Sequence, residues 1–140
     1  MRLAVIDSSV AVKWVLGEPD SGLALRLKER YRLIAPELLA AEFSNTLWKR
    51  IRSGEISPGQ GREALVLLRE TGLELVPMQG LLDAAVQMAI AIDHPAYDCL
   101  FASLALREQC PLITSDIKFL RKIREQPLIV MTLDEAAAGF

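Results

Sequence analysis

Two acidic residues, Asp7 and Asp116, stand close behind short apolar runs of the kind that forms strands. Asp7 follows residues 3–6 directly, and Asp116 follows residues 112–114 with one serine between. In open α/β sheets, ligands bind at the carboxyl ends of the strands, near the point where strand order reverses. Neighbouring strands lie about 4.8 Å apart, so two such carboxylates could face one hard cation. Either acid could instead only cap the helix that follows it.

Asp98 is the least ordinary acid of the chain, because it lies near the start of a stretch, 95–109, that is apolar nearly all round. Such a stretch is typical of a buried helix. The neighbours of Asp98 on the helix surface are Phe101, Ala102 and Ala105. A buried carboxylate is costly unless a cation or hydrogen bonds compensate it, so we favour a functional role. The alternative is a structural acid that the helix dipole stabilises in the first turn.

Glu42 lies beside the apolar stripe of a long expected helix, 36–53. Phe43 and Leu47 belong to that stripe, whereas Glu42 and Asn45 fall on an adjacent polar one. Taken alone, Glu42 fits a solvated surface glutamate. A functional role requires the polar stripe to face a cleft, with Asn45 as a hydrogen-bonding partner of Glu42.

Short β-branched runs alternate with longer stretches of helical period, which predicts a parallel sheet with helices on both faces. The expected strands cover residues 3–6, 33–35, 74–77, 112–114 and 128–131. The expected helices cover residues 9–16, 21–31, 36–53, 57–71, 80–92, 95–109 and 117–124. Pro36 and Pro95 suit first helical turns, and Gly54 and Gly72 suit helix ends. A chain of 140 residues with this pattern is expected to form one domain, 1–140, around one core.

The composition is that of a folded protein, with 51% hydrophobic and 24% charged residues. No apolar run approaches the roughly 20 residues of a membrane helix, and the first acid comes too early for a signal peptide, so we expect a cytoplasmic protein. The net charge of −2 offers nucleic acid no overall attraction, so such binding needs a local basic stripe or a metal. Cys99 and Cys110 lack metal-ligand spacing and are expected to be buried thiols.

Other side chains give weaker signals. His94 is the only histidine, and it is expected at a helix entry or on the surface rather than in catalysis. Asp93 fits a cap or a turn. Trp14 and Trp48 fall in helical patterns that favour core or interface positions. Basic residues that could hold phosphates, or simply form solvated helix faces, are Lys13, Lys49, Arg50, Arg52, Lys118, Arg121, Lys122 and Arg124.

Taken together, four acidic motifs resemble those of the PIN domain family, and within it the VapC-type toxins of bacterial and archaeal toxin–antitoxin pairs. The motifs are VIDSS around Asp7, PELLAAEFSNTL around Glu42, YDCLFASLA around Asp98 and LITSDIKF around Asp116. They occur in this order over essentially the whole chain, from residue 3 to about 131. Their combination is more specific than any single motif.

The resemblance implies an α/β fold, a PIN-like three-layer sandwich with a five-stranded parallel sheet in the order 3-2-1-4-5 and about seven flanking helices. It implies an endoribonuclease that depends on Mg²⁺ or Mn²⁺ and is inhibited by a VapB-like antitoxin. The implied metal-site and catalytic acids are Asp7, Glu42, Asp98 and Asp116. The implied supporting polar residues are Asn45, Thr114 and Ser115.

Such an acid set suits phosphodiester hydrolysis. Clustered carboxylates repel one another, and a hard divalent ion with oxygen ligands removes that cost. We hypothesise that one or two ions activate a water, while a pocket carboxylate orients this water or accepts its proton. A filled acidic pocket also attracts phosphate, which answers the objection from net charge.

Further partners and one rival class follow from the same residues. Apolar side chains along the early helices suggest that two copies pair and that an antitoxin segment docks in an apolar groove. The alternative to an enzyme is an inactive PIN-like scaffold or a receiver-like metal-binding module. A receiver needs an aspartate after its third strand and a lysine after its fifth, where this chain has VPM (76–78) and VMT (130–132).

Overall fold

A five-stranded parallel sheet forms the middle layer of the fold, in a computed structural model that describes residues 1–17 and 21–138. The strands are β1 (Arg2–Ile6), β2 (Tyr31–Pro36), β3 (Glu74–Val76), β4 (Leu112–Ile113) and β5 (Val130–Met131). Their order is β3-β2-β1-β4-β5, and each neighbouring pair is parallel. The predicted sheet and its order are therefore confirmed.

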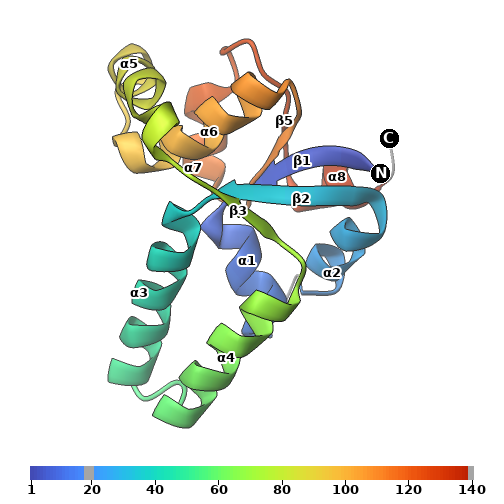
Figure 1. The fold of residues 1–140 in the computed structure, drawn as a ribbon, viewed down its shortest axis with the longest axis vertical. Helices are drawn as coiled ribbons and strands as arrows, with labels where there is room; N and C mark the ends of the chain where they lie inside the picture. The colour runs from blue at the N-terminus through green and yellow to red at the C-terminus, as the bar shows by residue number, and fades with distance from the viewer. Residues whose placement is uncertain (18–20, 139–140) are drawn as a thin grey trace.

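Helices cover both faces of the sheet (Figure 1). One side carries α1 (Ser8–Val15), α2 (Ser21–Arg30), α3 (Leu38–Arg52) and α4 (Pro58–Glu70). The other side carries α5 (Leu82–Ile92), α6 (Ala96–Glu108) and α7 (Ile117–Ile123). The short 3₁₀ helix η1 (Gln79–Leu81) precedes α5, and α8 (Leu133–Ala137) packs on α2 and β5. Within 1–17 and 21–138, no helix has the length and apolar character needed to cross a bilayer.

Several helices differ from expectation, and Pro95, expected in the first turn of α6, is instead its N-cap. Pro36 ends β2, and α3 begins only at Leu38, so the prediction of Pro36 in a first helical turn is wrong. The helix α8 was not expected, which makes eight α-helices among the described residues instead of about seven. Gly54 and Gly72 do follow α3 and α4, with φ of +83° and +80°, as expected of glycines at helix ends.

The core lies between the sheet and its two helical layers. The middle strands and residues 99–105 of α6 are buried, as predicted for an apolar helix. Cys99 and Cys110 are buried free thiols, as predicted. Trp14 and Phe43 also belong to the core, whereas Trp48 is 53% exposed, with the Arg52 guanidinium 4.7 Å from its ring centroid.

The point where strand order reverses lies between β1 and β4. The chain leaves β1 toward β2 on one side, whereas β4 pairs with β1 on the other side. The register pairs Ile6 with Ile113, so Asp7 and Thr114 follow their strands at the same level. This is the point where strand order reverses, at which open α/β sheets bind their ligands.

Candidate active site

Asp7 is the most buried acid of the candidate site, with 5% of its surface exposed. It caps α1, because its Oδ1 accepts the backbone N–H groups of Ser9 at 3.1 Å and Val10 at 3.4 Å. The Ser9 hydroxyl also donates to Oδ1, and the Thr114 hydroxyl donates to Oδ2. Burial raises the pKa of Asp7 to about 6, although the Ser9 and Thr114 hydrogen bonds lower it, and the charge of Asp98 raises it further. The helix cap and the candidate site therefore use the same carboxylate.

Asp116 is connected to Asp7 through Thr114, which is fully buried. The Thr114 hydroxyl donates to Asp7 and accepts the backbone N–H of Asp116 at 3.0 Å. The Asp116 Oδ1 accepts the backbone N–H of Phe119 at 3.1 Å and so caps α7. Ser115 completes the connection, because its N–H donates to the Ser9 hydroxyl at 2.9 Å. The two strand-end acids thus belong to one hydrogen-bonded network across β1 and β4.

Glu42 reaches the same region from α3. The Ser8 hydroxyl donates to Glu42 Oε1 at 2.6 Å, across 34 residues of sequence. Burial raises the pKa of this half-buried carboxyl, the Ser8 hydrogen bond lowers it, and the charge of Asp98 raises it again. Asn45 is exposed, and a supporting role for it stays a prediction. Ser8 is a partner of Glu42 that sequence reasoning missed.

Asp98 lies in the first turn of α6 and pairs with His94. The His94 Nε2 lies 2.6 Å from Asp98 Oδ2, and the two side chains are 7% and 31% exposed. The His94 ring stacks on Phe119 of α7, with centroids 5.0 Å apart and planes at 25°. His94 does stand just before α6, but the alternative of a surface position is wrong. Its spacing of four residues from Asp98, about one helical turn, is the signal that could have found this pair.

Electrostatic coupling links three of the four predicted acids. The charge of Asp98 raises the pKa of both Asp7 and Glu42. Carboxylates that repel one another and offer only oxygen donors fit a hard divalent ion in type and in charge. In the described ranges, however, no three His, Cys, Asp or Glu side chains are arranged as a ligand set. Coordination by all four acids therefore stays a prediction.

Basic residues on α3 and α7, the helices that carry Glu42 and begin at Asp116, have different settings. Lys118 and Arg121 are exposed on α7, and Lys49 is exposed on α3. The Lys122 Nζ instead donates to the backbone oxygen of Asp93 at 2.5 Å. Asp93 is the C-cap of α5, with φ of 52°, which confirms its expected place at a cap or turn.

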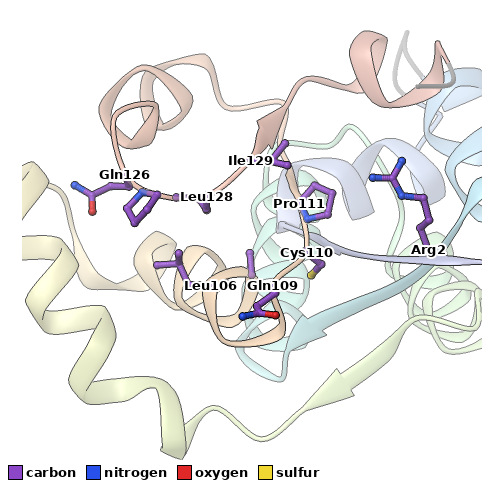
Figure 2. Close-up of a pocket in the computed structure, with 10 residues that line it drawn as sticks. Arg2, Leu106, Gln109, Cys110, Pro111, Gln126, Leu128 and Ile129 are labelled. Atoms are coloured by element: carbon purple, nitrogen blue, oxygen red, sulfur yellow. The ribbon is translucent and has the colours of Figure 1, made fainter.

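The opposite edge of the sheet holds a cavity of about 600 Å³ (Figure 2). Arg2 at the start of β1, together with Cys110 and Pro111 just before β4, lines it, and Gln126 and Ile129 come from the segment before β5. None of the described residues that line this cavity is an acid. The candidate site is therefore defined by its charges and not by the size of a hollow.

The geometry agrees with the comparisons to known proteins. A model of the PIN domain family matches residues 4–125. The chain belongs to the PIN domain family. This PIN domain is similar to Ribonuclease VapC1 of Mycobacterium tuberculosis, with 32% identity over 120 residues that cover 83% of this chain and 87% of the relative. The resemblance to VapC-type proteins is thereby confirmed.

Solved structures show the same fold. PAE2754 from Pyrobaculum aerophilum has a TM-score of 0.76 at 20% identity, over 98% of this chain and 95% of that chain. VapBC2 from Rickettsia felis, solved bound to a DNA fragment from their promoter, has a TM-score of 0.68 at 20% identity, over 93% and 98%. Both likenesses concern the fold of this PIN domain alone.

Proposed function

We propose that this PIN domain is a divalent-metal-dependent endoribonuclease, the toxin component of a type II toxin–antitoxin pair. The observation that carries the proposal is the hydrogen-bonded network at the carboxyl edge of the sheet, which joins Asp7 to Asp116 through Thr114. The charge of Asp98 also raises the pKa of Asp7 and Glu42. Similarity to Ribonuclease VapC1 supports RNA as the substrate. The family match supports a single PIN domain over residues 4–125, and its extension to 1–140 stays a prediction. A cytoplasmic location stays a prediction.

The ion would be Mg²⁺ or Mn²⁺, held by Asp7, Glu42, Asp98 and Asp116. Their oxygen donors suit these hard cations, and the mutual repulsion of the carboxylates gives a reason to bind one. When bound, such an ion lowers the pKa of a coordinated water and offsets charge on the reacting phosphate.

The surroundings of each side chain suggest its role in the proposed reaction. Asp7 is held by backbone and hydroxyl donors on both oxygens, so its orientation is set by the fold. Glu42 is half-buried, and its raised pKa suits a group that accepts a proton from the attacking water. The Ser8 hydroxyl fixes Glu42 Oε1, and we assign the proton to Oε2. Thr114 and Ser115 support Asp7 through the network that joins β1 to β4.

The substrate would follow basic side chains at the site. Lys49 lies two helical turns beyond Glu42 on α3, and Lys118 and Arg121 lie on the exposed side of α7. Exposed cations attract the phosphates of RNA without reading its bases. We propose them as the side chains that contact the phosphates of the substrate.

An antitoxin and a second copy would cover exposed apolar surface. Leu25 of α2 and Leu67 of α4 are 55% and 50% exposed and line a common hollow of about 270 Å³, which suits an apolar antitoxin segment.

A second copy of the chain would cover α5. On this helix, Leu82, Val86 and Ile90 are 47%, 51% and 78% exposed at a spacing of four residues, which suits a symmetric pair. Light scattering should give a dimer at micromolar concentration, and a monomer alone would contradict the pairing.

Cleavage of a labelled single-stranded RNA tests the enzymatic proposal. We expect cleavage with Mg²⁺, loss of cleavage in EDTA, and recovery when Mn²⁺ or Mg²⁺ is added in excess. Asp7→Asn should abolish cleavage while circular dichroism shows a folded protein. Asp83→Asn, an equal change at an exposed acid of α5, is the control and should cleave normally. Unchanged cleavage by Asp7→Asn, or in EDTA, would refute the proposal.

A further inference from the structure

We propose that His94 is a positioning residue of the active site, which holds the carboxylate of Asp98 in place for the metal ion. The inference rests on the proposed function, because it assigns His94 a role through one of the metal-site acids.

The His94 ring has a fixed place between α6 and α7. Its side chain is 7% exposed, and it stacks on Phe119, which is fully buried. A planar ring packed against a buried aromatic ring has few alternative rotamers. The direction of the Nε2 atom toward Asp98 is therefore set by packing, before any ligand arrives.

The direction of the hydrogen bond between His94 and Asp98 follows from the charge of the acceptor. An ionised carboxylate only accepts hydrogen bonds, so the His94 Nε2–H is the donor to Oδ2 over 2.6 Å. The other ring nitrogen, Nδ1, is buried and has no hydrogen-bond partner among the described residues. In the neutral ring with its proton on Nε2, this nitrogen is a bare acceptor. Among the described residues, the hydrogen bond of the ring is thus directed at Asp98, a predicted metal ligand.

The turn before α6 is anchored to the helix that carries Phe119. Asp93 adopts a left-handed conformation, and its backbone oxygen accepts Lys122 of α7 at 2.5 Å. The same helix begins at its cap, Asp116. His94 and Lys122 therefore connect the element that bears Asp98 to the element that bears Asp116. This arrangement fixes two predicted metal ligands relative to each other.

Holding one carboxylate oxygen restricts rotation of the Asp98 side chain. Groups that orient a metal ligand through a hydrogen bond commonly contribute roughly 10- to 100-fold to metal affinity. Removal of the Nε2–H should accordingly weaken metal binding while the fold survives. A residue that served only the packing of α6 on α7 would affect stability and leave the affinity of the folded protein unchanged.

Two substitutions test the hydrogen-bond donor and the aromatic ring of His94 separately. His94→Phe keeps an aromatic ring against Phe119 and removes the donor, whereas His94→Gln keeps an N–H donor and removes the ring. Mn²⁺ binding to the full chain is followed by electron paramagnetic resonance, with a thermal melt of each variant. We expect His94→Phe to weaken Mn²⁺ binding about tenfold or more and His94→Gln to retain most of the wild-type affinity. Wild-type affinity in folded His94→Phe would overturn the inference.

Asp98→Asn distinguishes failure of this inference from failure of the proposed function. If Asp98→Asn binds Mn²⁺ as tightly as wild type, or if wild type binds none, the metal site itself is wrong and both proposals fall. If Asp98→Asn weakens binding and His94→Phe does not, only the positioning role fails.

The single histidine allows a second readout that does not depend on the folding of His94→Phe. The ¹H–¹⁵N long-range spectrum of the wild-type ring should show the proton on Nε2, and the ring signals should shift when Mg²⁺ saturates the protein. In Asp98→Asn the Mg²⁺-dependent shift should be absent. Ring signals that carry the proton on Nδ1, or that do not respond to Mg²⁺ in wild type, would overturn the proposal.

Discussion

The two edges of the sheet differ in chemistry although the same strands form both. At the carboxyl edge, Asp7 follows β1 and Thr114 follows β4, and their side chains are buried and hydrogen-bonded to each other. At the amino edge, Arg2 and Pro111 line a cavity of about 600 Å³ that has no acid among its described lining residues (Figure 2). The PIN domain thus concentrates charge at one edge and open volume at the other. The cavity therefore lies at the edge opposite the predicted metal-site acids.

The difference follows from the direction of the chain. At the carboxyl edge, β1 and β4 lead into the N-terminal ends of α1 and α7, where free N–H groups and the helix dipole stabilise carboxylates. Asp7 and Asp116 occupy these two positions as caps. At the amino edge, the chain arrives from helix C-terminal ends, such as Gln109 after α6, which do not favour acids. The buried acids that cap helices therefore lie at the carboxyl edge, whereas glutamates in last turns at the amino edge, such as Glu70 and Glu108, are exposed.

The largest expected effect contrasts one substitution at each edge. Asp98→Asn should lower RNA cleavage by about 1,000-fold or more, the scale of losing a group that acts on the transition state. Gln126→Ala, in the lining of the amino-edge cavity, should stay within about twofold of wild type, because it removes no charge from the site. Initial rates with labelled RNA measure both. A comparable loss in Gln126→Ala would break the distinction between the edges.

The next largest effect is the pH dependence of the free energy of unfolding of the metal-free protein. Burial raises the pKa of Asp7 to about 6 in the folded state, so the folded state binds the proton more tightly than the unfolded chain does. The resulting stabilisation is fully present below the unfolded pKa of about 3.9 and is lost as pH rises through about 6, which amounts to about 3 kcal/mol at neutral pH.

Asp7→Asn has no such proton to lose. Its free energy of unfolding, relative to that of wild type, should therefore rise by most of about 3 kcal/mol between acidic and neutral pH. Urea denaturation in EDTA at several pH values measures this difference. A difference that does not change with pH would mean that burial at the carboxyl edge does not disfavour the Asp7 carboxylate.

The smallest expected effect tests whether residues at the amino edge contribute to stability only. Gln109 caps the end of α6 in a left-handed conformation, with φ of 53°, which a residue with a Cβ adopts at a cost. Gln109→Gly should raise the free energy of unfolding by about 0.5–1 kcal/mol and leave RNA cleavage unchanged. Thermal and urea denaturation measure the gain. Reduced cleavage in this variant would assign the amino edge a part in the reaction.

Local sequence signals were sufficient for the strands and for the placement of Asp7 and Asp116 after them, whereas Glu42 taken alone fitted a solvated surface residue. Strand order followed from the PIN resemblance, and the caps at Asp7 and Asp116 followed from their place between an apolar run and a helix. The helix α8 is only five residues long, so it lacks a helical period, although Thr132 and Glu135 form the capping box that announces it.

Contacts between distant segments could not be predicted in the same way. The burial of His94 depends on Phe119, 25 positions further along the chain, and the Ser8 hydroxyl meets Glu42 only because α3 packs beside α1. Neither contact has a local pattern. Pro36 shows the opposite case, because the local preference of proline for first helical turns placed it in α3, whereas it is the last residue of β2.

The most direct test of the account is the position of manganese in crystals grown with Mn²⁺, located by anomalous scattering. The account predicts a peak at the carboxyl edge of the sheet, roughly 2.1 Å from carboxylate oxygens that include those of Asp7 and Asp98. The peak should disappear in Asp98→Asn crystals. Saturating Mn²⁺ that gives no peak at these acids, or gives one only elsewhere on the protein, would contradict the account.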